Sequence, residues 1–106
     1  MSTRATIAVR RTDWSFQAVY LHFDGYPEHA GEALAAHFAT PALAESLVSG
    51  PDLRCIDRNT GAVERYRDSR GPTNLPTRDA LMVFAQNCSS QYVYVFEDGM
   101  WSCEQT

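Results

Sequence analysis

The sequence predicts an α+β fold in which an antiparallel sheet built from hairpins carries short helices on one face. Pairs of runs with alternating apolar side chains, joined by short turns, predict the hairpins. Apolar residues that recur three and four positions apart predict helices between those pairs. The chain has 106 residues, of which 44% are hydrophobic, and this is the size of one ordinary domain. We therefore expect residues 1–106 to form a single α+β domain with the element order ββ-αα-ββ-α-ββ.

Residues 5–10 and 16–23 predict the first hairpin. Ile7 and Val9 lie on one side of the first run, and the second run is rich in aromatic and β-branched side chains, which favour strands. The polar residues 11–15 between them predict a turn. The two strands should therefore pair in antiparallel fashion.

Two short helices are expected next. Pro27 suits the first position of a helix, where its missing N–H costs nothing, and Glu28 complements the positive helix terminus. Thr40 and Pro41 predict the cap and first residue of a second helix, which Gly50 ends. The expected inner face of the first helix is Ala30, Ala33, Leu34, His37 and Phe38, and that of the second is Leu43, Leu47 and Val48.

The second hairpin is predicted from residues 53–57 and 62–67, which flank a short turn that ends at Gly61. Residues 68–76 predict a loop.

The last elements are a helix and a closing hairpin. Thr77 can cap a helix over 78–86, with its inner face formed by Leu81, Met82, Phe84 and Ala85. Residues 92–96 predict the clearest strand of the chain, and 100–103 return after a turn at Gly99.

Alternation places Tyr92, Tyr94 and Phe96 on one face of their strand, opposite Val93 and Val95. Tyr20 and His22 have the same place in the second strand. If helices cover the aliphatic face, the aromatic face is left for a ligand or partner, since aromatic side chains serve as binding anchors. The alternative is that a loop or a second subunit of a homodimer covers it.

Charge is distributed in blocks. The net charge is −4; residues 12–53 and 79–106 contain acids but no Arg, whereas 1–11 and 54–78 are Arg-rich. The negative total argues against direct nucleic-acid binding, which favours basic chains, and permits binding to a basic protein surface. We expect an acidic face built on Asp13, Asp24, Glu28, Glu32 and Glu45.

The cysteines Cys55, Cys88 and Cys103 form no Cys-x-x-Cys pair. An odd number without such a pair predicts reduced thiols rather than a disulfide framework or zinc site. No run approaches the length of a membrane helix and no secretory pattern follows the first residues. A cytoplasmic protein without metal or cofactor is expected, which does not act at a membrane.

His22, Asp24, His29 and His37 are candidates for a metal or acid–base site, because imidazole and carboxylate groups bind metal ions and transfer protons. The two helical histidines are eight positions apart, so they do not converge on one ion. A structural role is favoured, in which Asp24 accepts hydrogen bonds from the turn before Pro27 and His22 bridges strand and helix. The chain is therefore expected not to be an enzyme.

Arg65, Arg67 and Arg70 could grip a phosphate or carboxylate, and Arg65 and Arg67 share a strand face. The favoured alternative is surface pairing with Glu64 or Asp68. As a second function, a nucleotide could be held by stacking and charge. The residues for this small-ligand site are Tyr20, His22, Arg65, Arg67, Tyr92 and Tyr94.

Two segments carry a family resemblance. Residues 2–9 read Ser-Thr-Arg-Ala-Thr-Ile-Ala-Val, and 19–27 read Val-Tyr-Leu-His-Phe-Asp-Gly-Tyr-Pro. They resemble a family of small phage and prophage proteins that begin with Ser-Thr-Arg and a strand and carry Tyr-x-His-Trp-Asp-Gly-Tyr-Pro. Residues 92–101 resemble that family's closing hairpin, residues 50–90 do not match, and Phe23 stands where Trp is usual.

The resemblance implies an accessory gene of a bacteriophage or integrated element and carries no established activity. Together with the small size and acidic blocks, it leads to the expectation of a phage-encoded inhibitor that binds a host protein through its acidic face. An example of such a target is an antiviral defence component such as a CRISPR effector complex. A small-ligand binder and a small enzyme using His22 and Asp24 remain the alternatives.

Overall fold

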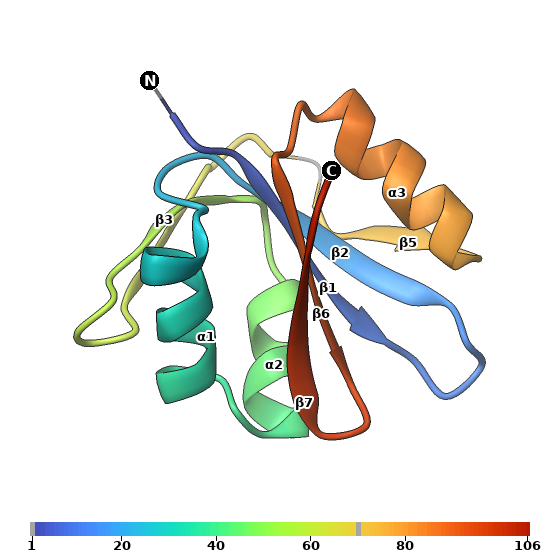
Figure 1. Ribbon diagram of the computed structural model, residues 1–106, viewed down its shortest axis with the longest axis horizontal. Helices are drawn as coiled ribbons and strands as arrows, with labels where there is room; N and C mark the ends of the chain where they lie inside the picture. Colours follow the sequence, from blue (N-terminus) through green and yellow to red (C-terminus); the bar gives the residue numbers. More distant parts are fainter. Residues whose placement is uncertain (1, 70) are drawn as a thin grey trace.

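The central feature of the computed structural model is a twisted mixed sheet (Figure 1). The structure describes residues 2–69 and 71–106. Over these residues the strands are β1 (Ala5–Arg10), β2 (Phe16–Leu21), β3 (Leu53–Ile56), β4 (Val63–Arg65), β5 (Thr73–Leu75), β6 (Tyr92–Glu97) and β7 (Met100–Gln105). The helical elements are the π-helical turn η1 (Pro27–Gly31) and the helices α1 (Glu32–His37), α2 (Pro41–Val48) and α3 (Arg78–Asn87).

The strand order is β4-β3-β2-β1-β6-β7, and β5 also pairs with β2. The three predicted hairpins are confirmed as the antiparallel pairs β1–β2, β3–β4 and β6–β7. The expectation of a purely antiparallel sheet is wrong, because β1 pairs with β6 and β2 with β3 in parallel. Long helical crossovers join the hairpins, and such connections allow parallel neighbours.

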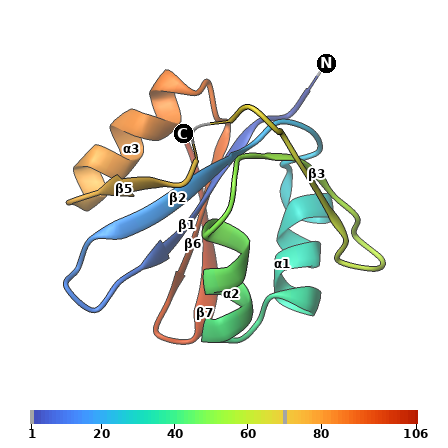
Figure 2. The ribbon, with the colours of Figure 1, turned by 180° about the vertical axis from the view of Figure 1, so that it is seen from behind.

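Helices cover both faces of the sheet, which corrects the expectation of helices on one face. Figures 1 and 2 show α1 and α2 on one side of the sheet and α3 on the other. The first side buries what we call the α1/α2 core, which includes Ile7, Val19 and Leu34. The second side buries the α3 core, which includes Ala8 and Leu81.

The aromatic face of β6 is not open. Tyr94 and Phe96 are buried in the α1/α2 core, and Tyr92 packs partly buried against it. Val93 and Val95 face α3. The prediction of an aliphatic face covered by helices and a free aromatic face therefore fails, since each face has its own helical cover.

The segment from η1 to the residue after α1 makes hydrogen bonds to both edges of the sheet, to β7 on one side and to the β3–β4 hairpin on the other. The Trp101 indole of β7 donates a hydrogen bond to the Phe38 carbonyl at 2.8 Å. On the other side, His29 and His37 donate from their ring nitrogens to the carbonyls of Ile56 and Arg58, at 2.8 and 3.0 Å. The histidines thus fasten the β3–β4 hairpin. His37 is only partly buried rather than a core residue.

Both predicted helix caps are confirmed. The Thr40 hydroxyl accepts from the Leu43 amide at 3.2 Å, and the Thr77 hydroxyl accepts from the Ala80 amide at 3.1 Å. Leu43 was expected on the inner face of its helix, but it is 46% exposed. It occupies the first turn of α2, and Ala44 is the buried residue there.

Strand β5 lies inside the segment predicted as a loop. It pairs with β2 through Phe16–Leu75 and Ala18–Thr73, and Leu75 packs against the α3 core. The edge of β2 that faces away from β1 therefore has two neighbours. Its first half pairs with β5, and its last residue, Leu21, pairs with Leu53 of β3. None of the described helices is long and apolar enough to cross a membrane.

Candidate partner-binding groove

A groove of about 520 Å³ opens at the end of the sheet where the β1–β2 and β6–β7 turns lie side by side. We call it the hairpin-end groove. Its lining comes from the end of β1 and the following turn, the first half of α2 and the β6–β7 turn. The lining residues are Val9, Arg10, Arg11, Thr12, Asp13, Pro41, Glu45, Phe96, Glu97, Asp98 and Gly99.

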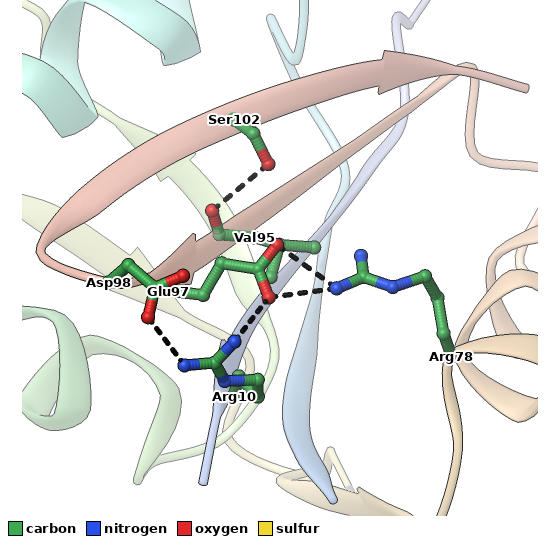
Figure 3. Close-up of polar contacts among 6 residues, drawn as sticks. All are labelled: Arg10, Arg78, Val95, Glu97, Asp98 and Ser102. Atoms are coloured by element: carbon green, nitrogen blue, oxygen red, sulfur yellow. Dashed lines mark hydrogen bonds and ion pairs between the residues drawn. The ribbon is translucent and has the colours of Figure 1, made fainter. Parts of the chain in front are cut away.

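Glu97 forms the centre of an ion-pair network at this groove (Figure 3). Its Oε2 lies 3.3 Å from Arg10 Nη1 and 2.8 Å from Arg78 Nη2. Arg10 also reaches Asp98 through Nη2, at 2.8 Å. The carboxylate of Glu97 is therefore shared by two guanidinium groups, whereas that of Asp98 is 77% exposed and remains open to solvent.

Arg11, the second arginine of the lining, also has an acidic partner. Arg11 Nη2 lies 2.9 Å from Glu45 Oε1 on α2, and the same nitrogen donates to the Gln17 side chain on β2. The lining carries four carboxylates against the guanidinium groups of Arg10 and Arg11. Because the guanidinium groups already bind carboxylates, the surplus charge that the groove offers to a partner is negative.

Asp13 contributes a carboxylate that its own turn keeps ionised. It accepts from the Ser15 hydroxyl at 2.5 Å and from the Ser15 amide at 3.0 Å. These two hydrogen bonds hold the pKa of Asp13 below its ordinary value, since hydrogen bonds to a carboxylate favour its charged form.

Trp14 stands beside the groove and is 68% exposed. Its backbone adopts the left-handed conformation, with φ of 70°. The Arg10 guanidinium carbon lies 4.4 Å from the centre of its ring, within cation–π range. The indole is thus exposed but oriented by a neighbour that itself belongs to the Glu97 network.

The predicted acidic residues do not form one face. Asp13 and Glu45 line the hairpin-end groove. Asp24 lies at the opposite end of β2, where it borders a separate hollow with His29 and Glu64. Six residues of strand separate the two ends, a span of about 20 Å. Glu28 on η1 and Glu32 on α1 are exposed and line neither of these two hollows.

The predicted small-ligand residues are divided by the sheet. Tyr20 pairs with Thr6, which pairs with Val93. Residues paired across neighbouring strands share a face, so Tyr20 projects on the α3 side, away from Tyr92 and Tyr94. Tyr20 instead lines a hollow of about 290 Å³ with Asp52, Gly71, Thr73, Phe84 and Cys88.

The two arginines of that set also have other places. Arg65 donates to the carbonyls of Pro51 and Leu47, at 2.6 and 2.8 Å, and so caps the end of α2. Burial lowers the pKa of its guanidinium. Arg67 is exposed beyond the end of β4. Among the described residues neither pairs with Glu64 or Asp68 as predicted, and Glu64 instead binds Arg54 at 3.2 Å. Arg70 lies outside the described residues.

His22 and Asp24 have no shared contact. The Nδ1 of His22 lies 2.7 Å from the Tyr20 hydroxyl, so its partner is a strand residue rather than the predicted helix. Asp24 is exposed and left-handed, with φ of 57°. Within residues 2–69 and 71–106, no group of three or more His, Cys, Asp or Glu side chains is placed to hold a metal ion.

Sequence reasoning missed Trp14, Glu97 and Asp98 as parts of a site. A large aromatic residue in the otherwise polar turn 11–15 was the available signal. No sequence pattern indicates that the β1–β2 and β6–β7 turns lie next to each other, because this depends on the parallel pairing of β1 with β6. Comparisons of the chain with protein-family models, curated proteins and solved structures found no match.

Proposed function

We propose that this chain is a phage-encoded inhibitor that binds a host protein, for example an antiviral defence component, through the hairpin-end groove. The observation that carries the proposal is the joint presence of surplus carboxylates and the 68% exposed Trp14 at one end of the fold. The phage origin rests on the resemblance of residues 2–9 and 19–27 described above.

The groove suits a basic protein segment. Complementary charge speeds association and fixes orientation, while tryptophan is prominent among residues that contribute most to binding energy. Nucleic acid is disfavoured as a direct ligand, since Asp13 and Asp98 would repel phosphate and Arg10 and Arg11 are already paired. A protein that itself binds nucleic acid has a basic channel, which this acidic end could occupy.

The test is capture of a host protein by the tagged chain, with mass spectrometry at low and high salt. Glu45→Arg reverses a charge in the groove on a helical position that tolerates Arg. Glu64→Arg makes the same charge change on β4, at the far edge of the sheet from β7. We expect a stoichiometric partner that high salt releases, that Glu45→Arg loses and that Glu64→Arg keeps.

Trp14→Ala should weaken the same capture, by about tenfold or more if the indole is an anchor. Circular dichroism of each variant confirms that the fold is retained. Equal capture by wild type, Glu45→Arg and Trp14→Ala would refute the groove as the binding surface.

A second candidate function is small-ligand binding at the hollow lined by Tyr20. Its lining combines the aromatic residue Phe84 with the polar residues Asp52 and Thr73, and ligand sites commonly combine apolar walls with a few polar groups. Native mass spectrometry of the purified chain distinguishes the two functions, since a retained small molecule supports this one.

A further inference from the structure

The outer edge of β7 is open. β7 is the last strand in the sheet order and pairs only with β6 among the described strands. The β6–β7 turn has two residues with positive φ, Asp98 at 54° and Gly99 at 78°. This type of turn places a hydrogen-bonded residue pair directly beside it.

The alternation of bonds along β7 identifies the free groups. Starting from the bonded pair Glu97–Met100, every second residue of β7 bonds to β6. The Thr106 amide fits this phase, since it donates to the Gln91 carbonyl at 3.0 Å. The N–H and C=O groups of the residues between therefore point to the open edge. These residues are Trp101, Cys103 and Gln105.

This edge carries one charged residue, Glu104, and otherwise lacks the features that usually block strand addition. Proteins protect exposed edges with Lys, Pro, bulges or a covering loop. Residues 97–106 contain no Lys, Arg or Pro, and the β6–β7 register runs without a bulge from Tyr92–Gln105 to Glu97–Met100. The edge is thus a regular template of about six residues.

A hollow of about 260 Å³ lies next to the edge and continues from the hairpin-end groove, with which it shares Phe96 and Gly99. Ala35, Ala39 and Trp101 belong to its apolar lining. Met100 forms one rim and is 71% exposed. The hollow can receive an apolar side chain of a strand laid beside β7.

The charged side chains of α1 and β7 are carboxylates, whereas the Arg10 guanidinium at the neighbouring turn is already paired with Asp98. The two blocks without Arg, residues 12–53 and 79–106, supply α1 and β7, which border the hollow together. Glu32 lies one helical turn before Ala35, and Glu104 lies on β7 itself. Burial raises the pKa of Tyr94, and the charge of nearby Glu28 adds to that shift.

We infer that β7 receives a basic, extended segment of a partner protein as an additional strand, with one apolar side chain in the hollow. This rests on the proposed function, in that the natural occupant is a protein. Addition of a strand to a sheet edge is an established mode of peptide recognition. A second copy of this chain is disfavoured as the occupant, because it would bring two acidic edges together.

The probe is a capped synthetic peptide of alternating valine and arginine, titrated into the ¹⁵N-labelled full chain at low ionic strength. Two control peptides leave the protein unchanged. One carries glutamate in place of arginine, and the other carries N-methyl groups on alternate amides, which remove the donors that would face β7. Amide shifts and hydrogen exchange are recorded for every residue of β7.

Binding of the arginine peptide should shift and protect the amides of Trp101, Cys103 and Gln105. The amides of Met100, Ser102 and Glu104, already bonded to β6, serve as the internal control and should change little in exchange. The N-methylated peptide should bind about tenfold more weakly or worse because it loses backbone hydrogen bonds to β7. The glutamate peptide should weaken by a similar factor because its charge repels the carboxylates near the edge.

Equal binding of the N-methylated peptide, or shifts confined to the groove residues 10–13, would overturn the inference. Slow exchange of the three outward amides in the free protein, together with a dimer in sedimentation, would also overturn it by assigning the edge to a second copy. A host protein captured by wild type but not by Glu45→Arg, with β7 unaffected by the arginine peptide, would leave the proposed function standing alone. Protected β7 amides without any captured host protein would leave the edge site standing alone.

Discussion

At the scale of single residues, Tyr94 links the segment after β2 to the sheet centre. It is 1% exposed, and its hydroxyl donates to the Gly25 carbonyl at 2.7 Å. Gly25 is in turn closely enclosed, since a Cβ there would lie 2.7 Å from that of Ala5. One hydroxyl thus holds the Asp-Gly-Tyr-Pro segment against β6.

Tyr94→Phe should lower the free energy of unfolding by about 1–3 kcal/mol, because it leaves a buried carbonyl without its donor. Tyr92→Phe, two positions earlier and only partly buried, is the matched control and should cost less. Urea unfolding of both variants and wild type at pH 8 measures the difference.

The same substitution carries a pH dependence. Burial raises the pKa of Tyr94, so the folded state keeps a proton that the unfolded chain loses above about pH 10. The contribution of the Tyr94 hydroxyl to the free energy of unfolding is fully present below pH 10. Above pH 10 it decreases by up to about 1.4 kcal/mol per pH unit. The cost of Tyr94→Phe should therefore shrink between pH 8 and pH 11, and a constant cost would contradict the assignment.

Prediction from sequence succeeded for residues whose partners are local. Thr40 and Thr77 cap helices that begin at the next residue, so spacing alone indicates their role. Arg65 could not be assigned in this way, because the carbonyls it caps lie some 14 to 18 positions earlier. The same limit applies to Glu97, whose partner Arg10 is 87 positions away.

At the scale of elements, two turns share a conformation and differ in surroundings. Gly61, in the β3–β4 turn, has φ of 76°, and Gly99, in the β6–β7 turn, has φ of 78°. A Cβ at Gly61 would lie 2.7 Å from Cβ and Cγ of His37 on α1, whereas none of the described atoms lies within 4 Å at Gly99. The β3–β4 turn is therefore packed against a helix and the β6–β7 turn is open.

Gly99→Ala should cost about 1–2 kcal/mol, the penalty of the left-handed conformation alone. Gly61→Ala should cost about 1–3 kcal/mol more, because the added methyl group also overpacks the contact with His37. Urea unfolding of the two variants tests this. Equal costs would show that the β3–β4 turn is not held against α1.

Element types and hairpins were accessible to pattern analysis, but their assembly was not. Alternation in residues 92–96 correctly separated the two sides of β6. It could not say which helix covers which side, since that follows from the parallel placement of β6 beside β1. The sequence pattern therefore places Tyr20 and Tyr94 in one ligand site, whereas the register sets them on opposite faces of the sheet.

At the scale of the molecule, one sheet separates two cores. Leu34 and Leu81 are both fully buried, the first in the α1/α2 core and the second in the α3 core. β1 serves both, since Ile7 points into one and Ala8 into the other. Neither core can be lost without exposing a face of the same strands.

Leu34→Ala and Leu81→Ala should each cost about 2–5 kcal/mol, with one cooperative transition in each variant. Tryptophan fluorescence and far-ultraviolet circular dichroism, followed through the same urea titration, should report coincident midpoints. Separate transitions in Leu81→Ala would contradict this prediction and show that the α1/α2 core is stable without α3.

The parallel neighbours β1 and β6 also govern the order in which the fold can form. The centre of the sheet joins Ala5–Arg10 to Tyr92–Glu97. In a chain leaving the ribosome, the β1–β2 hairpin therefore lacks its neighbour β6 until residues 92–97 have been made. Contacts between such distant segments slow folding, because a long loop must close first. During synthesis one edge of β1 stays exposed, and a nascent chain of this design depends on prompt completion or on chaperones for protection from aggregation.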